Sequence, residues 1–151
     1  MTTTQQRSYT IKEAAALTGL PASTLRYYES IGVIAPISRG ASSGHRVYDD
    51  ADLDQLMSVA CLSATGMSVA DMKQYVANRD LGQAAAEGQI ALLATQQERL
   101  RREAEQMVLR QRYVALKIDY WGAVRDGDPQ RAERIAAEAA TLADALKQTP
   151  R

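Results

Sequence analysis

The chain has 151 residues, of which 46% are hydrophobic and 24% charged, with 18 basic and 18 acidic side chains; this is the size and composition of one ordinary soluble domain. No stretch approaches the roughly 18 apolar residues of a membrane span, and the opening residues lack the basic and apolar segments of a signal peptide, so we expect a cytoplasmic protein that does not contact a membrane. The single cysteine, Cys61, excludes an internal disulfide and a multi-cysteine metal site.

Two short helices are predicted near the N-terminus. The segment IKEAAALT (11–18) has helical apolar spacing, with Thr10 as its N-cap and Gly19 as its stop. A second helix begins after Pro21 and runs through ASTLRYYESI until Gly32 ends it. Two helices joined by a tight turn form a helix-turn-helix, whose second helix can enter a DNA major groove. Many helical hairpins have this form without binding DNA, so that alternative stays open at this point.

Adjacent tyrosines in the second helix point in different directions, because neighbouring helical positions are about 100° apart. Leu25 and Tyr28 lie three residues apart and share the inward face. The outward face then carries Arg26 as a reader of a base or a phosphate, and Tyr27 as an uncharged phosphate anchor. Ser23 and Thr24 belong to the same outward face.

A β-hairpin is predicted directly after the helix-turn-helix, in a region where residues 1–48 hold five Lys or Arg against two acids. Within APISRGASSGHRVYDD, the pieces PIS and RVY are compatible with β-strands and enclose a loop rich in Gly and Ser. Basic side chains at its tip and base suit it to gripping DNA phosphates as a wing, although a solvated surface hairpin has the same pattern. The predicted DNA contacts are Ser23, Thr24, Arg26, Tyr27, Arg39, His45, Arg46 and Tyr48.

Two further helices follow the wing. The aspartates that end the wing can cap the first of them, which Gly66 closes. Ser68 and Asp71 have the spacing of a capping box for the next helix, which is expected to end near Asn78. These elements complete a predicted DNA-binding domain over residues 8–80. The apolar side of the first of the two helices is predicted to carry Leu53, Leu56, Met57, Ala60, Cys61 and Ala64.

A heptad seam follows, in which ten residues succeed one another at alternating intervals of three and four. The seam consists of Ile90, Leu93, Gln97, Leu100, Ala104, Met107, Gln111, Val114, Ile118 and Trp121. A long single helix of this kind, here called the rod, cannot bury its apolar stripe alone. We therefore predict a coiled-coil dimerisation helix over residues 83–124 that pairs with a partner helix. Folding back onto the chain's own N-terminal helices is the alternative. Gln97 and Gln111 occupy places where polar residues fix the register of a coiled coil.

A last helix is predicted over residues 129–147, started by Asp128 and Pro129. It is expected to pack against the rod or against a partner subunit, through Ile135, Ala139, Leu142 and Leu146. The predicted fold class is therefore mainly α, with a winged helix-turn-helix DNA-binding domain, a long dimerisation helix and a short C-terminal helix.

Three stretches of the chain together carry a resemblance to a known family. The stretches YTIKEAAALTGLPASTLRYYESIGVI, GHRVYDDADL and ATGMSVADMKQYV, followed by the long helix, resemble the MerR family of bacterial transcription regulators over residues 9 to about 121. The resemblance implies a homodimer held by an antiparallel coiled coil. It also implies two winged domains that bind an inverted repeat in double-stranded promoter DNA and distort it so that RNA polymerase can use the promoter. A two-fold dimer independently requires a palindromic site.

The resemblance also bears on the signal that such a regulator senses. Metal-sensing members use cysteines and drug-sensing members a large domain, and neither follows Trp121 in this chain. The chain is most similar to the thiol-dependent branch that responds to aldehydes and other electrophiles, and Cys61 falls at the position of its reactive cysteine. Ser63 departs from the basic residue that this branch often carries there. The alternatives are a structural Cys61 and a non-covalent small ligand as inducer.

Other classes of function have less support in the sequence. No nucleophile motif accompanies the only histidine, His45. The sequence also contains no phosphate-cradling glycine loop and no metal-ligand spacing. We therefore expect neither an enzyme nor a metal or cofactor site. A coiled-coil adaptor that binds another protein is the remaining alternative. An affinity for DNA that weakens steeply with salt distinguishes a DNA-binding protein from an adaptor.

Overall fold

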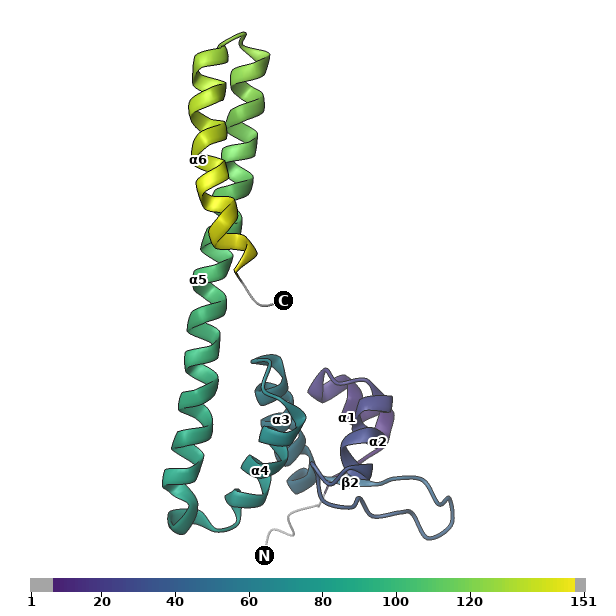
Figure 1. The fold of residues 1–151 in the computed structure, drawn as a ribbon. Coiled ribbons are helices and arrows are strands. Elements are labelled where there is room, and N and C mark those ends of the chain that lie inside the picture. Colours follow the sequence, from purple (N-terminus) through teal and green to yellow (C-terminus); the bar gives the residue numbers. More distant parts are fainter. Residues whose placement is uncertain (1–6, 149–151) are drawn as a thin grey trace, which may run out of the picture. The chain divides into compact units, whose positions relative to one another are not determined.

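The structure is a computed structural model and describes residues 7–148 (Figure 1). Its elements are β1 (Ser8–Tyr9), α1 (Ile11–Thr18), α2 (Ala22–Ser30), β2 (Tyr48–Asp49), α3 (Asp50–Ala64), α4 (Val69–Arg79), the 3₁₀ turn η1 (Gly82–Ala85), α5 (Ala86–Arg125) and α6 (Pro129–Lys147). The chain divides into two compact units at Gln96, within α5. The predicted mainly α order, with a winged helix-turn-helix followed by a long helix and a C-terminal helix, is confirmed.

The turn between α1 and α2 is built by residues at the ends of α1. The Thr10 hydroxyl accepts a hydrogen bond from the backbone of Glu13 at 3.1 Å, and the Glu13 carboxylate accepts one from the backbone of Thr10 at 3.2 Å. This capping box satisfies two backbone N–H groups that the first turn leaves without helical partners. Gly19 ends the helix at φ 73°, a left-handed conformation that favours glycine. The chain can therefore reverse within three residues and begin α2 after Pro21.

The core of the first unit draws side chains from α1, α2, α3 and α4 and from the wing. Leu25, Leu56 and Val59 have no exposed surface, and Met72 of α4 is 1% exposed. Burial of such side chains stabilises the unit by about 1.5–3 kcal/mol each. The rest of the buried cluster consists of Ala14, Tyr28, Val33, Ile34, Ile37, Tyr48 and Met67. This shared core fixes α2 and the wing relative to each other.

Helix α3 begins as predicted but buries a different side. Asp49 is the N-cap and forms a reciprocal capping box with Asp52. Leu56 and Val59 are the buried residues of α3, whereas Met57 is 43% exposed and Cys61 is exposed. The predicted apolar side was wrong at Met57, Cys61 and Ala64, which are all exposed. The reason is that α3 carries apolar residues around more than one face, and spacing alone did not select the buried one.

The wing is a hairpin held by few backbone hydrogen bonds. Val47 N–H donates to the Ser38 carbonyl and Gly40 N–H donates to the His45 carbonyl, both at 2.8 Å. Arg39 and Arg46 form a single β-bridge between the two arms. The sequence analysis did not predict that the second arm continues into β2, which pairs antiparallel with β1 through the couples Ser8–Asp49 and Tyr9–Tyr48.

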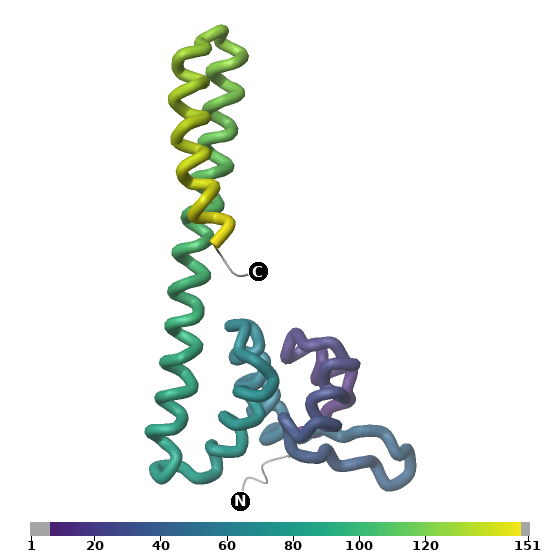
Figure 2. The backbone as a smooth tube through the Cα atoms, viewed as in Figure 1, coloured from purple at the N-terminus to yellow at the C-terminus, as the bar shows by residue number. Residues whose placement is uncertain are grey.

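The second unit is a helical hairpin, in which α6 runs back along the C-terminal part of α5 (Figure 1 and Figure 2). Leu116 and Ala123 of α5 are buried, as are Ala132 and Ala139 of α6. Arg112 pairs with Glu138 across the hairpin at 2.7 Å. The last helix therefore packs against its own rod, which is one of the two positions expected for it.

Candidate nucleic-acid interface

Helix α2 separates buried from exposed side chains as its sequence predicts. Leu25 is fully buried, Tyr28 is 6% exposed, and the Tyr28 hydroxyl donates a hydrogen bond to the Ser63 hydroxyl at 3.2 Å. Tyr27 is 52% exposed, and Arg26 is also exposed. Ser23 is exposed and Thr24 half-buried on the same helix. Polar and aromatic side chains thus remain available to a ligand on the outward face of α2.

Two of the predicted wing contacts are also exposed. Arg39 donates a hydrogen bond to the Gly44 carbonyl at 3.1 Å, across the loop of the wing. His45 is exposed, and its backbone N–H donates to the Ser43 hydroxyl at 3.2 Å. These local hydrogen bonds order the tip of the wing while the two side chains stay accessible.

Arg46 lies on the wing as predicted, but its guanidinium is already engaged. Its Nε donates to a Glu29 carboxylate oxygen at 2.6 Å, and the two side chains are only 19% and 14% exposed. The other carboxylate oxygen of Glu29 accepts the backbone N–H of Ile37 at 3.1 Å. Burial by itself raises the pKa of Glu29, but the hydrogen bonds from Arg46 and Ile37 outweigh it and hold this pKa below its ordinary value. Glu29 therefore fastens the end of α2 to both arms of the wing.

Tyr48 belongs to the core rather than to the surface. It has no exposed area, and among residues 7–148 its hydroxyl is the buried side-chain polar atom that lacks a hydrogen-bond partner. Burial raises its pKa. The predicted DNA contact is corrected here, because pairing of β2 with β1 turns this side chain inward, where a phosphate does not reach it.

Basic side chains from three elements surround one hollow in the first unit. The hollow has a volume of about 210 Å³. Lys12 of α1, Arg26 of α2 and Arg39 of the wing contribute cationic groups, and the remaining lining residues are Thr10, Ile11, His45 and Arg46. The sequence analysis missed Lys12. Its position two residues after the N-cap of α1 was a usable signal, because it places the side chain in the first turn, beside the helix-turn-helix.

Within residues 7–148, no group of three or more His, Cys, Asp or Glu is arranged to hold a metal ion. No helix in this part of the chain is long and apolar enough to cross a membrane.

Comparison with known proteins gives consistent matches. Residues 9–79 match the family described as MerR HTH family regulatory protein. The regulator AdhR of Bacillus subtilis is 34% identical over 90 residues, which are 60% of this chain and 64% of that protein. The uncharacterised regulator YyaN of the same organism is 40% identical over 68 residues, 45% of this chain and 49% of that protein. The chain therefore spans between about half and two thirds of the length of these curated relatives.

Solved structures extend the likeness beyond the helix-turn-helix. HiNmlR, described as a MerR family regulator lacking the sensor domain and bound to promoter DNA, superposes with a TM-score of 0.68 at 25% identity, over 85% of this chain and 96% of that one. A MerR family regulator from Listeria monocytogenes gives a TM-score of 0.66 at 28% identity, over 86% and 98%.

Proposed function

The chain belongs to the MerR family of regulatory proteins through its helix-turn-helix at residues 9–79, and on this premise we propose that it regulates transcription by binding double-stranded promoter DNA. It acts as a homodimer on an inverted repeat, distorts the DNA between the half-sites and works with RNA polymerase at that promoter. Membership in a family of regulators also agrees with the expectation that the chain is not an enzyme.

The observation that carries this proposal is the basic hollow beside the outward face of α2. Lys12, Arg26 and Arg39 come from three elements and line one concave surface. Clustered cations of this kind attract the DNA backbone, and an adaptor that binds a protein helix has no need of them. The likeness to HiNmlR, which was solved with promoter DNA, supports the same ligand.

The proposed contacts fall into two groups. On α2, Arg26 reads a base edge or binds a phosphate, and the Tyr27 hydroxyl donates to a phosphate, with Ser23 and Thr24 beside them. Lys12, Arg39 and His45 bind backbone phosphates from the rim of the hollow. Arg46 and Tyr48 are left out of the set, because the first is paired with Glu29 and the second is buried.

The homodimer is supported by the accessibility of the seam. All ten seam residues are exposed in the chain, and the large apolar ones range from 38% exposed at Leu100 to 67% at Ile118. Exposed apolar patches of this extent mark interaction surfaces. A two-fold dimer then presents two α2 helices to the two halves of an inverted repeat.

The experiment that tests DNA binding compares two variants in gel-shift titrations at several salt concentrations. Arg26→Ala is expected to cost about 1–3 kcal/mol of operator binding. Lys12→Gln is expected to lower the slope of log K against log salt by about one, because one phosphate contact is lost. Lys147→Gln, at the end of α6, is the matched control and should change neither quantity. An affinity for operator fragments that does not respond to salt would point to the adaptor instead.

We further propose that Cys61 senses small electrophiles. Its exposed position on α3 supports this proposal, because the thiol is open to reagents in the chain. The thiolate sulfur adds to the β-carbon of an unsaturated aldehyde, a carbon–sulfur bond forms, and water supplies the proton taken up at the neighbouring carbon. The adduct changes the surface of α3 and thereby the distortion of the bound promoter DNA.

Cys61→Ala is expected to bind the operator normally and to lose induction by unsaturated aldehydes in a reporter assay. Mass spectrometry of the treated native protein should find the adduct on a peptide containing Cys61. Ser58→Ala, one helical turn earlier on α3, is the matched control. If Cys61→Ala responds fully, the inducer is a ligand that binds without covalent chemistry.

A further inference from the structure

The first turns of α5 are tied to the ends of α3 and α4 by two glutamine side chains. The Nε2 of Gln96 donates a hydrogen bond to the Thr65 carbonyl at 2.8 Å, and Gln96 is only 5% exposed. The Nε2 of Gln89 donates to the Tyr75 carbonyl at 2.8 Å, and its Oε1 accepts from the Nδ2 of Asn78 at 3.2 Å. Thr65 is the C-cap of α3, and the other two partners belong to the C-terminal half of α4. All five residues lie within the first unit.

The two glutamines lie on the same side of α5. They are seven residues apart, which is nearly two helical turns, so their attachments are about 10 Å apart along the helix axis. A helix that is attached at one point can swing about it, whereas two points on one side fix its direction. Each glutamine precedes a seam residue, Ile90 or Gln97, by one position and therefore points about 100° away from it. The attachment thus leaves the seam exposed.

Few apolar side chains support this attachment. Three large apolar residues lie in α5 between positions 86 and 96, and of these only Leu92 is half-buried. Ile90 and Leu93 are 58% and 41% exposed. The hydrophobic effect depends on buried area and has no direction, whereas a hydrogen bond weakens steeply when its donor and acceptor leave their line. The direction of the first turns of α5 therefore depends on the two glutamine amides.

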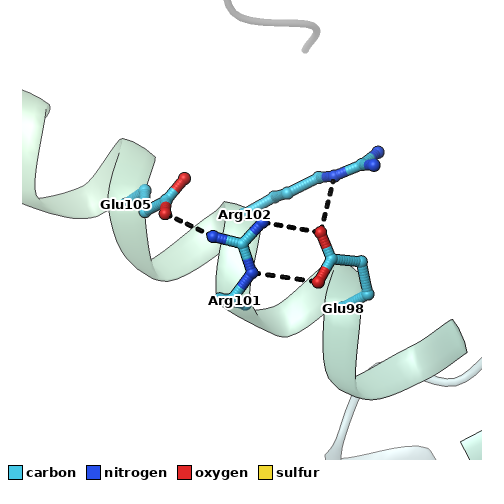
Figure 3. Close-up of polar contacts among 4 residues, drawn as sticks. All are labelled: Glu98, Arg101, Arg102 and Glu105. Atoms are coloured by element: carbon cyan, nitrogen blue, oxygen red, sulfur yellow. Dashed lines mark hydrogen bonds and ion pairs between the residues drawn. The ribbon is translucent and has the colours of Figure 1, made fainter. Parts of the chain in front are cut away.

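Beyond Gln96, ion pairs run along the surface of α5 itself (Figure 3). Arg101 donates to Glu98 at 2.7 Å and pairs with Glu105 on its other side. Arg102 lies 3.4 Å from the same Glu98 carboxylate. The hydrogen bond from Arg101 lowers the pKa of Glu98 to about 2, so the network stays charged at neutral pH. These pairs join residues three or four positions apart, and they therefore support the helix rather than its attachment to α3 and α4.

We propose that Gln89 and Gln96 are positioning residues, which fix the direction in which the rod leaves the DNA-binding unit. The consequence for the promoter rests on the proposed homodimer. In that dimer the direction of α5 sets the separation of the two α2 helices, and with it the spacing of half-sites that the protein prefers. A protein that distorts DNA also has to hold its two contact surfaces against the deformation energy of the duplex. A loosely attached rod would yield instead.

The direction of α5 is measured by pulsed electron spin resonance on the full chain with Cys61→Ala. Spin labels are attached at Ala51→Cys on α3 and Glu103→Cys on α5, both at exposed positions. Dilution with unlabelled chain ensures that distances within one chain are recorded. The native glutamines should give one narrow distance distribution. The double variant Gln89→Met, Gln96→Met keeps long, flexible side chains without donors, and should about double the width because a released helix samples several directions.

Thr95→Ala is the matched control for the spin-label measurement. Its hydroxyl donates to the Ala91 carbonyl at 2.9 Å, within α5, so its loss should leave the width unchanged. Gln89→Met alone changes the less buried of the two glutamines and should broaden the distribution by a smaller amount. This single variant tests the proposal even if circular dichroism shows that the double variant is unfolded. Folded variants with the native width would overturn the proposal.

The preferred spacing of half-sites provides a second measurement. The probes are DNA duplexes that the native protein selects from random sequence, rebuilt with the spacer one base pair longer or shorter. In gel-shift titrations the native protein should prefer the selected spacing. The double variant Gln89→Met, Gln96→Met should lose about tenfold of this preference, a factor that two hydrogen bonds of ordinary net strength can supply. An unchanged preference would overturn the role of the two glutamines at the promoter.

Sedimentation separates this inference from the homodimer on which its consequence rests. A monomer whose narrow distribution broadens in the double variant overturns the homodimer and the spacing rule, and supports the attachment of α5 by the glutamines. A dimer whose distribution is already broad in the native protein overturns the attachment and leaves the homodimer standing.

Discussion

Ile118→Asp is expected to convert the dimer into a folded monomer. Ile118 is 67% exposed in the single chain, so an aspartate at this position stays hydrated there and leaves the α5–α6 hairpin intact. In the proposed homodimer the seam meets an apolar surface of the partner helix, so the same side chain is removed from water. Symmetry buries two such carboxylates for each dimer, at a cost of several kcal/mol.

Sedimentation velocity and circular dichroism together check this result. The variant should sediment at the mass of one chain and keep its helical signal. Operator affinity should fall with the loss of the dimer, because a monomer engages only one half-site. Ala137→Asp introduces the same charge on an exposed face of α6 and should remain a dimer. An Ile118→Asp variant that still sediments as a dimer would move the interface away from the seam.

Local signals in the sequence were sufficient to predict much of the fold. Thr10, Asp49 and Ser68 occur as caps because each side chain meets a backbone N–H only three residues away. The burial of Leu25 and Tyr28 follows from helical geometry alone. The exposed seam follows from its heptad spacing. In each case the decisive interaction lies within one or two helical turns.

The features that were missed depend on segments distant in sequence. Strands β1 and β2 are two residues each, too short to show an alternating pattern, yet their pairing buries Tyr48. Arg46 meets Glu29 across 17 positions, and no local pattern distinguishes a paired arginine from a phosphate ligand. Cys61 is exposed because the core of the first unit selects another face of α3. Tertiary packing decides the burial and the partners of each of these side chains.

Loss of the ion pair between Glu29 and Arg46 is expected to destabilise the folded chain. Arg46→Ala is expected to lower the free energy of unfolding by about 2–4 kcal/mol, somewhat below the loss for a fully buried pair, because both side chains keep some exposure. It leaves the Glu29 carboxylate in place with only the Ile37 N–H as its partner. Arg39→Ala, whose side chain is exposed and bonds only to the Gly44 carbonyl, is the matched control in urea denaturation and should cost much less.

The same pair makes a distinct prediction for DNA binding. Because Arg46 fastens the wing to α2 through Glu29, Arg46→Ala should weaken operator binding without changing its salt slope. Arg39→Ala should instead reduce the slope by about one. Glu29→Gln should resemble Arg46→Ala, since either change releases the wing. If Arg46→Ala reduces the salt slope as Arg39→Ala does, Arg46 leaves Glu29 on binding and contacts a phosphate.

The dependence of stability on pH provides an independent check. The pKa of Glu29 is lower in the folded chain than its ordinary value of about 4.3 in the unfolded chain. The pair therefore contributes its full stability above that value, and the contribution disappears as the pH falls through the lower, folded pKa. Native protein should lose more stability than Glu29→Gln between about pH 5 and pH 3 in urea titrations. Parallel curves for the two proteins would mean that Glu29 is not held as a carboxylate by Arg46, and the wing would then have to be fixed to α2 by the apolar core alone.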